Sequence, residues 1–251
     1  MGGLGNQLFQ YAFMRHIQMQ GFQEVYIDTN FYSDTPETPD TNVTARHFEL
    51  SFLQTRYTAF DGGGYSPCSR IVYEAKGEYD PAVLQTNDVY LVGFWQDLKF
   101  CGDIFPFCRE EFRLKPQYID KMISDMEKEM TDSFSVSLHI RRTDYLNEDN
   151  RNLFAPCTME YYEKAVRSIH RMTGETPVLF LFSDDMDYVK LHLSGFCGCK
   201  TVFVESGTSY QDLYLMSRAK HQIIANSTFS WWASVLNENN HITIAPKKWL
   251  W

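Results

Sequence analysis

The sequence predicts an α/β protein whose second half forms a parallel, doubly wound sheet. From residue 135 onward, short apolar segments alternate regularly with amphipathic ones, which is the pattern of parallel strands covered by helices. The segment 178–182 (VLFLF) is continuously apolar, as expected of a strand that is covered on both faces. We therefore expect ligands to bind at the carboxyl edge of this sheet.

The first half is less regular. Residues 2–7 (GGLGNQ) predict a glycine-rich turn, and the apolar stripe that follows predicts a helix at 8–20. Strands are expected at 24–28 and 89–95, and a helix with one apolar face is expected over 119–130. Glycines allow a backbone to approach a ligand closely, and a helix N-terminus offers free N–H groups to an anion.

The second half predicts one element after another. The expected strands are 135–140, 178–182, 201–204, 222–225 and 242–245. The expected helices are 159–172, 187–193, 210–220 and 229–236. Thr158 is expected to cap the first of these helices and Gly174 to end it.

Composition excludes several classes of partner. The formal net charge of −9 argues against nucleic acid or an anionic membrane as the main partner. No apolar run approaches the length of a membrane span, and no signal peptide is recognised. The six cysteines lack metal-finger spacing and are expected to be reduced thiols, which predicts a cytoplasmic protein.

Polar side chains cluster where the predicted strands end. These clusters are His139, Arg141, Arg142 and Asp144 after the first strand, Ser183, Asp184 and Asp185 after the second, Glu205, Ser206 and Thr208 after the third, and Asn226, Ser227 and Thr228 after the fourth. Because parallel strands end at one edge of a sheet, we expect these clusters to lie together.

Each cluster allows a ligand-binding and a structural interpretation. Adjacent arginines suit bidentate binding of phosphate, and the alternative is a strand end whose charges are paired on the surface. Asp212 could accept hydrogen bonds from a guanine edge, although a first-turn carboxylate that favours the helix dipole is the commoner case. Asp184 and Asp185 could bind ribose or a metal, but no further ligands converge convincingly on them.

Four motifs, taken in order along the chain, resemble those of the bacterial α-1,2-fucosyltransferases of glycosyltransferase family 11. They are GGLGNQLFQYA (2–12), HIRRTDY (139–145), SDD (183–185) and ANSTFSWWASVLN (225–237), with RHFEL at Arg46 and IAPKKW near the end. The resemblance extends over nearly the whole chain. It implies a GT-B-type fold of two Rossmann-like lobes, with an acceptor-side lobe at residues 1–130 and a donor-binding lobe at 131–251.

The resemblance also implies the reaction and its residues. The reaction would be inverting, metal-independent transfer of L-fucose from GDP-β-L-fucose to the 2-hydroxyl of a terminal β-galactoside, with no cofactor. Arg141 would bind the β-phosphate beside Arg142 and His139, and Asp212 would read guanine. Gly3, Asn6 and Gln7 would close over the donor. The remaining donor-binding candidates are Ser183, Asp184, Asp185, Asn226, Ser227, Thr228 and Phe229.

The catalytic base has several candidates. Glu148 and Asp149 follow the arginine motif, where related fucosyltransferases place an acid, and Asp144 is a rival whose alternative role is to orient an arginine. The alternative to a carboxylate base is a dissociative route, in which phosphate helps.

Two features depart from the family pattern. Met1 stands directly before Gly2, where the family turn normally follows a strand, and the chain stops at Trp251, where members usually continue. Incomplete terminal packing is therefore expected, and two further hypotheses stay open: a non-catalytic GDP-sugar or glycan binder and a Mg²⁺-dependent phosphatase-like hydrolase. A peripheral association with the inner face of a bacterial membrane also stays open.

Overall fold

A computed structural model describes residues 1–22, 24–33, 46–60, 68–75, 79–85, 87–143, 145 and 156–249. The chain divides into two compact units, Met1–Arg113 and Leu114–Trp251. The predicted lobe boundary after residue 130 differs from this division because α5 (Lys121–Asp132) packs against α9 (Ser209–Arg218) of the second unit. The assignment of functional lobes stays a prediction.

The first unit is built around one long helix, α1 (Leu4–Met19). Its other elements are β1 (Tyr26–Asp28), α2 (Asn30–Ser33), β2 (Thr58–Phe60), β3 (Arg70–Tyr73), β4 (Val89–Val92), α3 (Leu98–Cys101) and α4 (Phe105–Glu111), with 3-10 turns at Leu50–Phe52 and Pro81–Gln85. Among the described residues, β1 pairs with β2 and β3 with β4, and both pairs are parallel. Phe13 and Ile17 of α1 pack with Trp95 and Phe100 in the core.

Two predicted elements of this unit have different ends. Helix α1 begins at Leu4 rather than at residue 8, with Gly3 as its N-cap, because Leu4 and Gln7 are buried and tertiary contacts outweigh the low helix propensity of Gly5. The strand predicted at 89–95 ends at Val92, and the buried Trp95 has a φ of 56°, which a strand does not allow.

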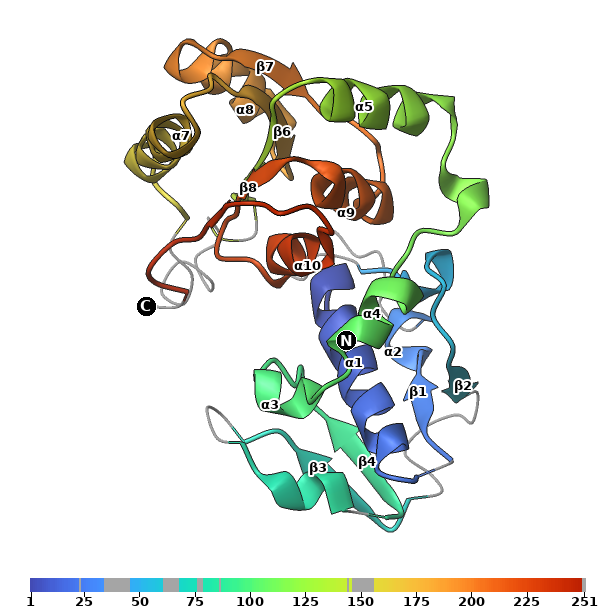
Figure 1. The fold of residues 1–251 in the computed structure, drawn as a ribbon. Coiled ribbons are helices and arrows are strands. Elements are labelled where there is room, and N and C mark those ends of the chain that lie inside the picture. Colours follow the sequence, from blue (N-terminus) through green and yellow to red (C-terminus); the bar gives the residue numbers. More distant parts are fainter. Residues whose placement is uncertain are drawn as a thin grey trace. The chain divides into compact units, whose positions relative to one another are not determined.

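The second unit confirms the predicted alternation of strands and helices. After α5 come β5 (Ser135–Ile140), α7 (Met159–Thr173), β6 (Val178–Ser183), α8 (Met186–Leu193), β7 (Lys200–Phe203), α9, β8 (His221–Ile223), α10 (Thr228–Leu236) and β9 (Thr243–Ile244), with 3-10 turns at Pro116–Tyr118 and Phe196–Gly198. The five strands form one parallel sheet in the order β7-β6-β5-β8-β9 (Figure 1). The order reverses between β5 and β8, so the topological switch point lies there.

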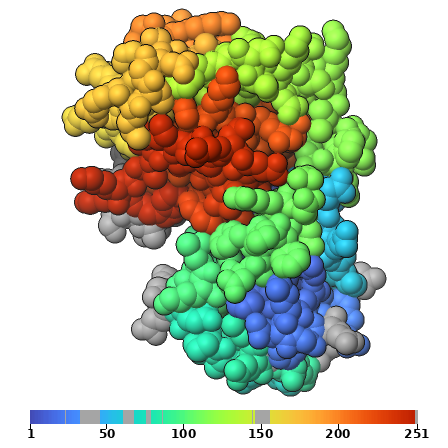
Figure 2. All heavy atoms as spheres, viewed as in Figure 1, coloured from blue at the N-terminus to red at the C-terminus, as the bar shows by residue number. Residues whose placement is uncertain are grey.

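Helices α7 and α8 cover one face of this sheet. Leu138 and Ile140 of β5 and Leu181 of β6 pack with Tyr162 of α7 and Val189 of α8 in one buried cluster. The opposite face receives α10, since the ring of Phe229 packs on His139 of β5. In Figure 2, atoms of the C-terminal part of the chain, coloured orange to red, cover the middle of the visible face of the second unit.

The predicted caps of α7 are confirmed. The Thr158 side chain accepts a hydrogen bond from the Tyr161 N–H (3.2 Å), and Gly174 ends the helix in the left-handed conformation with a φ of 76°. These local signals explain why the helix begins within one residue of its expected position.

All six cysteines lie within the described residues, and all are free thiols. No described helix has both the length and the apolarity that crossing a bilayer requires.

Candidate active site

Side chains along β5 alternate between the two faces of the sheet. Ile140 belongs to the core beneath α7 and α8, whereas His139 packs against Phe229 of α10, with 5.6 Å between ring centroids. Arg142 follows the end of the strand and lines a cavity with Ile140. Arg141 does not line that cavity, so the two adjacent arginines have different surroundings.

The two aspartates after β6 pair with different arginines. Ser183 is the register partner of Ile140, so the residues that follow these two strands lie side by side. Asp184 Oδ2 lies 3.2 Å from Arg141 Nε, and Asp185 Oδ2 lies 3.2 Å from Arg142 Nε. Each arginine thus has a carboxylate of its own. The Ser183 hydroxyl accepts a hydrogen bond from the Asp185 N–H (3.0 Å).

Asp184 also orders the backbone after β5. It accepts hydrogen bonds from the N–H groups of Arg142 (2.9 Å) and Thr143 (3.2 Å) and from the Thr143 hydroxyl. Its side chain is 17% exposed and that of Arg141 is 19% exposed, so the pair is only partly screened by water. This geometry favours an orienting role for Asp184, and ribose binding by either aspartate stays a prediction.

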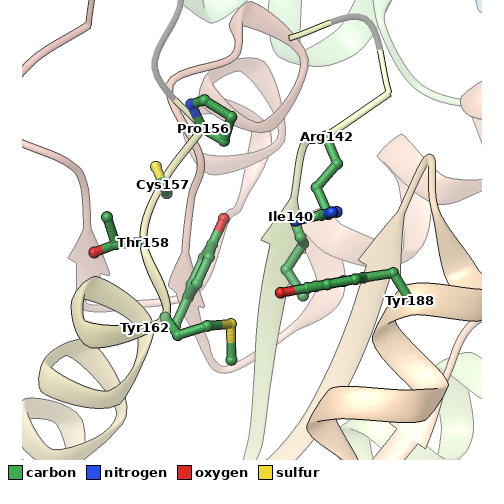
Figure 3. Close-up of a pocket in the computed structure, with 8 residues that line it drawn as sticks. Ile140, Arg142, Pro156, Cys157, Thr158, Tyr162 and Tyr188 are labelled. Carbon is green, nitrogen blue, oxygen red and sulfur yellow. The ribbon is translucent and has the colours of Figure 1, made fainter. Parts of the chain in front are cut away.

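Arg142 is held on its edge and on its face. Asp185 binds Nε, and the guanidinium carbon lies 3.4 Å from the centroid of the Tyr188 ring (Figure 3). Asp185 is also the N-cap of α8, since its Oδ1 accepts a hydrogen bond from the Tyr188 N–H (3.1 Å). One carboxylate therefore begins the helix that presents Tyr188 and orients the arginine that stacks on it.

The cavity beside Arg142 has a volume of about 290 Å³. It is lined by Ile140, Arg142, Pro156, Cys157, Thr158, Met159, Tyr162 and Tyr188. Figure 3 shows that these side chains come from the end of β5, from the segment entering α7 and from α8. Burial raises the pKa of the Cys157 thiol, which is therefore not an activated nucleophile.

Helix α10 begins at Thr228, one residue before its predicted start, and follows β8 at the switch point. Ser227 is its N-cap and makes no side-chain capping bond, and Thr228 is its first residue. Asn226 is buried, and its side chain bonds to Cys157 Sγ (3.6 Å) and to the Trp249 carbonyl (3.2 Å). Asn226 thus supports this turn from within, while the residues after it form the helix N-terminus.

His139 is more deeply buried than a phosphate ligand usually is. It is 4% exposed and its ring lies against Phe229. The His139 carbonyl accepts a hydrogen bond from the Tyr162 hydroxyl (3.1 Å), which fixes α7 to the end of β5. The rings of His139 and Phe229 therefore pack against each other between β5 and α10.

Asp212 lies in the first turn of α9 and is partly exposed. Its Oδ1 accepts a hydrogen bond from the Ser206 hydroxyl (2.7 Å), and no hydrogen bond from the described residues reaches Oδ2. Burial raises the pKa of Asp212 to about 7, and the Ser206 hydrogen bond only partly opposes this shift. No described cation is paired with Asp212, which distinguishes it from Asp184 and Asp185.

The glycine turn, residues 2–7, belongs to the first unit. Gln7 donates hydrogen bonds to the carbonyls of Gly2 (3.1 Å) and His47 (2.8 Å) and accepts one from the Glu49 N–H (2.8 Å). Gln7 is therefore buried inside the turn and ties two motifs together rather than offering its amide to a ligand.

Gly3 and Asn6 lie nearer the surface of this turn. The Arg46 guanidinium lies against Gly3, where a Cβ would be 3.5 Å from Nη1. The Asn6 side-chain oxygen accepts a hydrogen bond from Gln96 (3.0 Å). Their predicted contact with the donor stays a prediction.

Several expectations fall outside the described residues or are untested. Asp144, Glu148 and Asp149, the candidate bases, lie outside the described residues. Within the described ranges, no three His, Cys, Asp or Glu side chains gather as a metal site would require. Metal independence stays a prediction.

Sequence reasoning placed Arg142 in the site and missed the other residues that line the cavity, among them Cys157, Tyr162 and Tyr188. Tyr188 lies three residues after the capping Asp185, in the first turn of α8, and that spacing could have marked it. Tyr162 lies one turn into α7 on its apolar face and was indistinguishable from a core residue. Cys157 offered no pattern of its own.

Comparison with known proteins identifies the family. The sequence profile of glycosyl transferase family 11 matches residues 76–250. The chain belongs to glycosyl transferase family 11. Among curated relatives of this family 11 chain is the alpha-1,2-colitosyltransferase of Escherichia coli, 31% identical over 99% of this chain and 90% of that protein. Another is the Escherichia coli O-antigen biosynthesis glycosyltransferase WbnK, 27% identical over 99% of this chain and 92% of its own length.

Solved structures agree with this family 11 assignment at the level of the fold. The NodZ α-1,6-fucosyltransferase of Bradyrhizobium, in a crystal soaked with GDP-fucose, aligns with a TM-score of 0.52 at 14% identity. The alignment covers 93% of this chain and 89% of that chain. At this identity the likeness shows the fold alone. The predicted family and the GT-B-type α/β fold are thus confirmed.

Proposed function

We propose that this family 11 glycosyltransferase transfers L-fucose from GDP-β-L-fucose to the 2-hydroxyl of a terminal β-galactoside, with inversion at the anomeric carbon and without a metal. The observation that supports this proposal is the pair of positive groups at the switch point. Arg141 follows β5, and the N-terminus of α10 follows β8, the neighbouring strand. Together they would bind the diphosphate where parallel sheets bind nucleotides.

The chemical step makes one bond and breaks another. The acceptor 2-hydroxyl oxygen attacks the anomeric carbon of fucose, and the bond from that carbon to the β-phosphate oxygen breaks. The electron pair goes to the departing GDP, whose negative charge Arg141 stabilises. The hydroxyl proton goes to a carboxylate, for which Asp144, Glu148 and Asp149 are the candidates, or to the phosphate.

Asp212 would recognise the base of the donor. An ionised carboxylate can accept hydrogen bonds from both guanine N1–H and the exocyclic amine, and its Oδ2 has no hydrogen bond from the described residues. This supports a guanosine rather than an adenosine donor, because adenine presents no such pair of donors.

A second donor is favoured by one specific observation. The 31% identical relative is named an alpha-1,2-colitosyltransferase, and colitose is L-fucose without its 3-hydroxyl. GDP-colitose is therefore the alternative donor. The named linkage of that relative also supports transfer to a 2-hydroxyl.

The test is transfer to lactose and N-acetyllactosamine from GDP-fucose and GDP-colitose, with the product linkage assigned by NMR. Arg141→Ala should lower kcat/KM for the preferred donor by about 10²–10³-fold, the usual loss when one donor to a developing anion is removed. Arg167→Ala is the matched control, because Arg167 is an exposed arginine of the same unit that pairs only with Glu163. Full activity of Arg141→Ala, or a product linkage other than α-1,2, would contradict the proposal.

A further inference from the structure

The two arginines after β5 serve different ligands, we infer, and the cavity that Arg142 lines is the subsite for the acceptor sugar. This inference rests on the proposed function, because it takes the acceptor to be a β-galactoside. It differs from the expectation that Arg142 assists Arg141 at the phosphate.

The position of Arg142 separates it from the nucleotide candidates. Arg142 is the only one of the predicted donor-binding residues that lines the cavity. His139 contacts α10, and Asp212 lies on α9, whereas the cavity lies between the start of α7 and α8. Arg141 and Arg142 are nonetheless consecutive, so their Cα atoms are about 3.8 Å apart. An acceptor at Arg142 would therefore lie beside a donor held at Arg141.

The contacts that hold Arg142 leave the two terminal nitrogens of its guanidinium to bind a ligand. Asp185 occupies Nε, at 3.2 Å, and Tyr188 covers the planar face, at 3.4 Å from its ring centroid. A guanidinium fixed on one edge and one face presents its two terminal nitrogens as a rigid pair of donors. Hydroxyl groups of a sugar accept such paired donation, and Figure 3 shows Arg142 beside Ile140 at the rim of the cavity.

The size and lining of the cavity suit one sugar ring. Its volume of about 290 Å³ lies at the lower limit of small-molecule sites, which is too small for a nucleoside diphosphate. The half-buried side chains of Met159 and Tyr188 offer apolar surface to sugar C–H groups, and the buried Ile140 and Tyr162 lie beneath them. Arg142 and Thr158 offer hydrogen bonds at the rim.

Kinetics with lactose and GDP-fucose, together with calorimetry of GDP, tests the inference. Arg142→Lys keeps the charge but loses the fork and the stacking, and Tyr188→Ala removes the surface on which the guanidinium rests. Both should raise KM for lactose at least tenfold and leave the Kd for GDP within twofold. Arg167→Lys is the matched control, because Arg167 is an exposed arginine of the same unit that does not line the cavity, and this variant should stay within twofold of wild type in both constants.

Two outcomes would overturn the inference. If the Kd for GDP rises as much as the lactose KM, Arg142 belongs to the nucleotide site. If the lactose KM of Arg142→Lys equals that of wild type, the cavity is not an acceptor subsite. Thermal unfolding shows whether Tyr188→Ala is folded, and Arg142→Lys keeps the test decisive if it is not.

A second readout needs no transfer, so it separates this inference from the proposed function. Cys157 lines the cavity and is half-buried, while Cys197 is exposed in the same unit. With GDP present, lactose or N-acetyllactosamine should slow alkylation of Cys157 by iodoacetamide at least threefold and leave Cys197 unchanged, as followed by mass spectrometry. Protection without transfer would contradict only the proposed donor or reaction. Absence of protection by both sugars would overturn the subsite.

Discussion

At the scale of single residues, the carboxylates of the site differ in what surrounds them. Asp184 and Asp185 are each paired with an arginine, and Asp184 accepts three further hydrogen bonds. Asp212 is surrounded by protein, has one hydroxyl donor, and has no cation among the described residues. The first two are therefore committed to arginine partners, whereas burial raises the pKa of Asp212 to about 7, so that Asp212 changes its protonation near neutral pH.

The raised pKa of Asp212 predicts a pH-dependent affinity for GDP. Guanine needs the ionised carboxylate, and the pKa of Asp212 in the folded protein is about 7. Affinity should therefore rise about fivefold to tenfold from pH 6 to pH 8, as the carboxylate loses its proton. Asp212→Asn should bind GDP weakly with no such rise. Calorimetry across this range measures both, and a flat profile for the wild type would show that Asp212 does not read the base.

The raised pKa of Asp212 also makes the stability of the fold depend on pH, and stability falls with rising pH where the affinity for GDP rises. The pKa of Asp212 is 3.8 in the unfolded chain and about 7 in the fold, so the folded state holds the proton more tightly and this contribution is lost as pH rises from about 4 to 7. Asp212→Asn removes the buried charge and should be more stable than wild type at pH 8 by roughly 1–2 kcal/mol, after allowance for partial exposure. Urea unfolding at pH 5 and pH 8 would reveal this, and an equal difference at both values would contradict it.

At the scale of elements, the two ends of α1 show how a glycine can have two functions. Gly2 and Gly21 both have positive φ, 83° and 101°, so either position disfavours any other residue. A Cβ at Gly21 would meet nothing within 4 Å, whereas one at Gly2 would run into the Asn6 side chain. Gly2 is therefore needed both for its left-handed backbone conformation and for the close approach of the Asn6 side chain. Gly21 is needed only for its backbone conformation.

This contrast gives a prediction with its control in the same helix. Gly2→Ala and Gly21→Ala should each lower the free energy of unfolding by about 1 kcal/mol, because both force a side chain into a left-handed conformation. Only Gly2→Ala should displace Asn6 and lower transferase activity, by about tenfold or more. Paired unfolding and activity measurements separate the two effects. Equal loss of activity in both variants would mean that Asn6 has no part in the site.

The elements of the second unit were predictable because several local signals agreed. Continuously apolar strands, a capping Thr158 and a left-handed Gly174 each mark a boundary independently. The start of α1 was not predictable in this way, because Gly2, Gly3 and Gly5 read as a continuous turn. Burial of Leu4 and the internal hydrogen bonds of Gln7 extend the helix through Gly5, and these depend on residues 40 positions away.

At the scale of the whole molecule, a formal charge of −9 coexists with a site that we propose for a diphosphate. Local geometry resolves this, because charges beyond about 10 Å are largely screened at moderate salt while Arg141 and the α10 N-terminus act at contact. The net charge of −9 therefore disfavours binding of large polyanions. Binding of a small anion depends instead on the groups at the switch point of the sheet.

Charge balance by protein groups predicts that a metal is not needed. With GDP-fucose and lactose, 10 mM EDTA should change the rate by less than about twofold, because Arg141 and backbone N–H groups stabilise the leaving diphosphate in place of a cation. Added Mg²⁺ or Mn²⁺ should not raise kcat. A loss of activity in EDTA that Mg²⁺ restores would instead support the metal-dependent alternative.

The sequence by itself determined the family, the parallel sheet of the second unit and the edge at which its polar residues gather, because strand period, caps and motifs are local properties. Only the tertiary structure decided that Arg142 and not Arg141 lines the cavity, and that Asp184 pairs with Arg141 while Asp185 pairs with Arg142. The physical reason is that a dipeptide does not specify on which side its residues find partners. That choice depends on α8 and α10, which pack on the two faces from positions far along the chain.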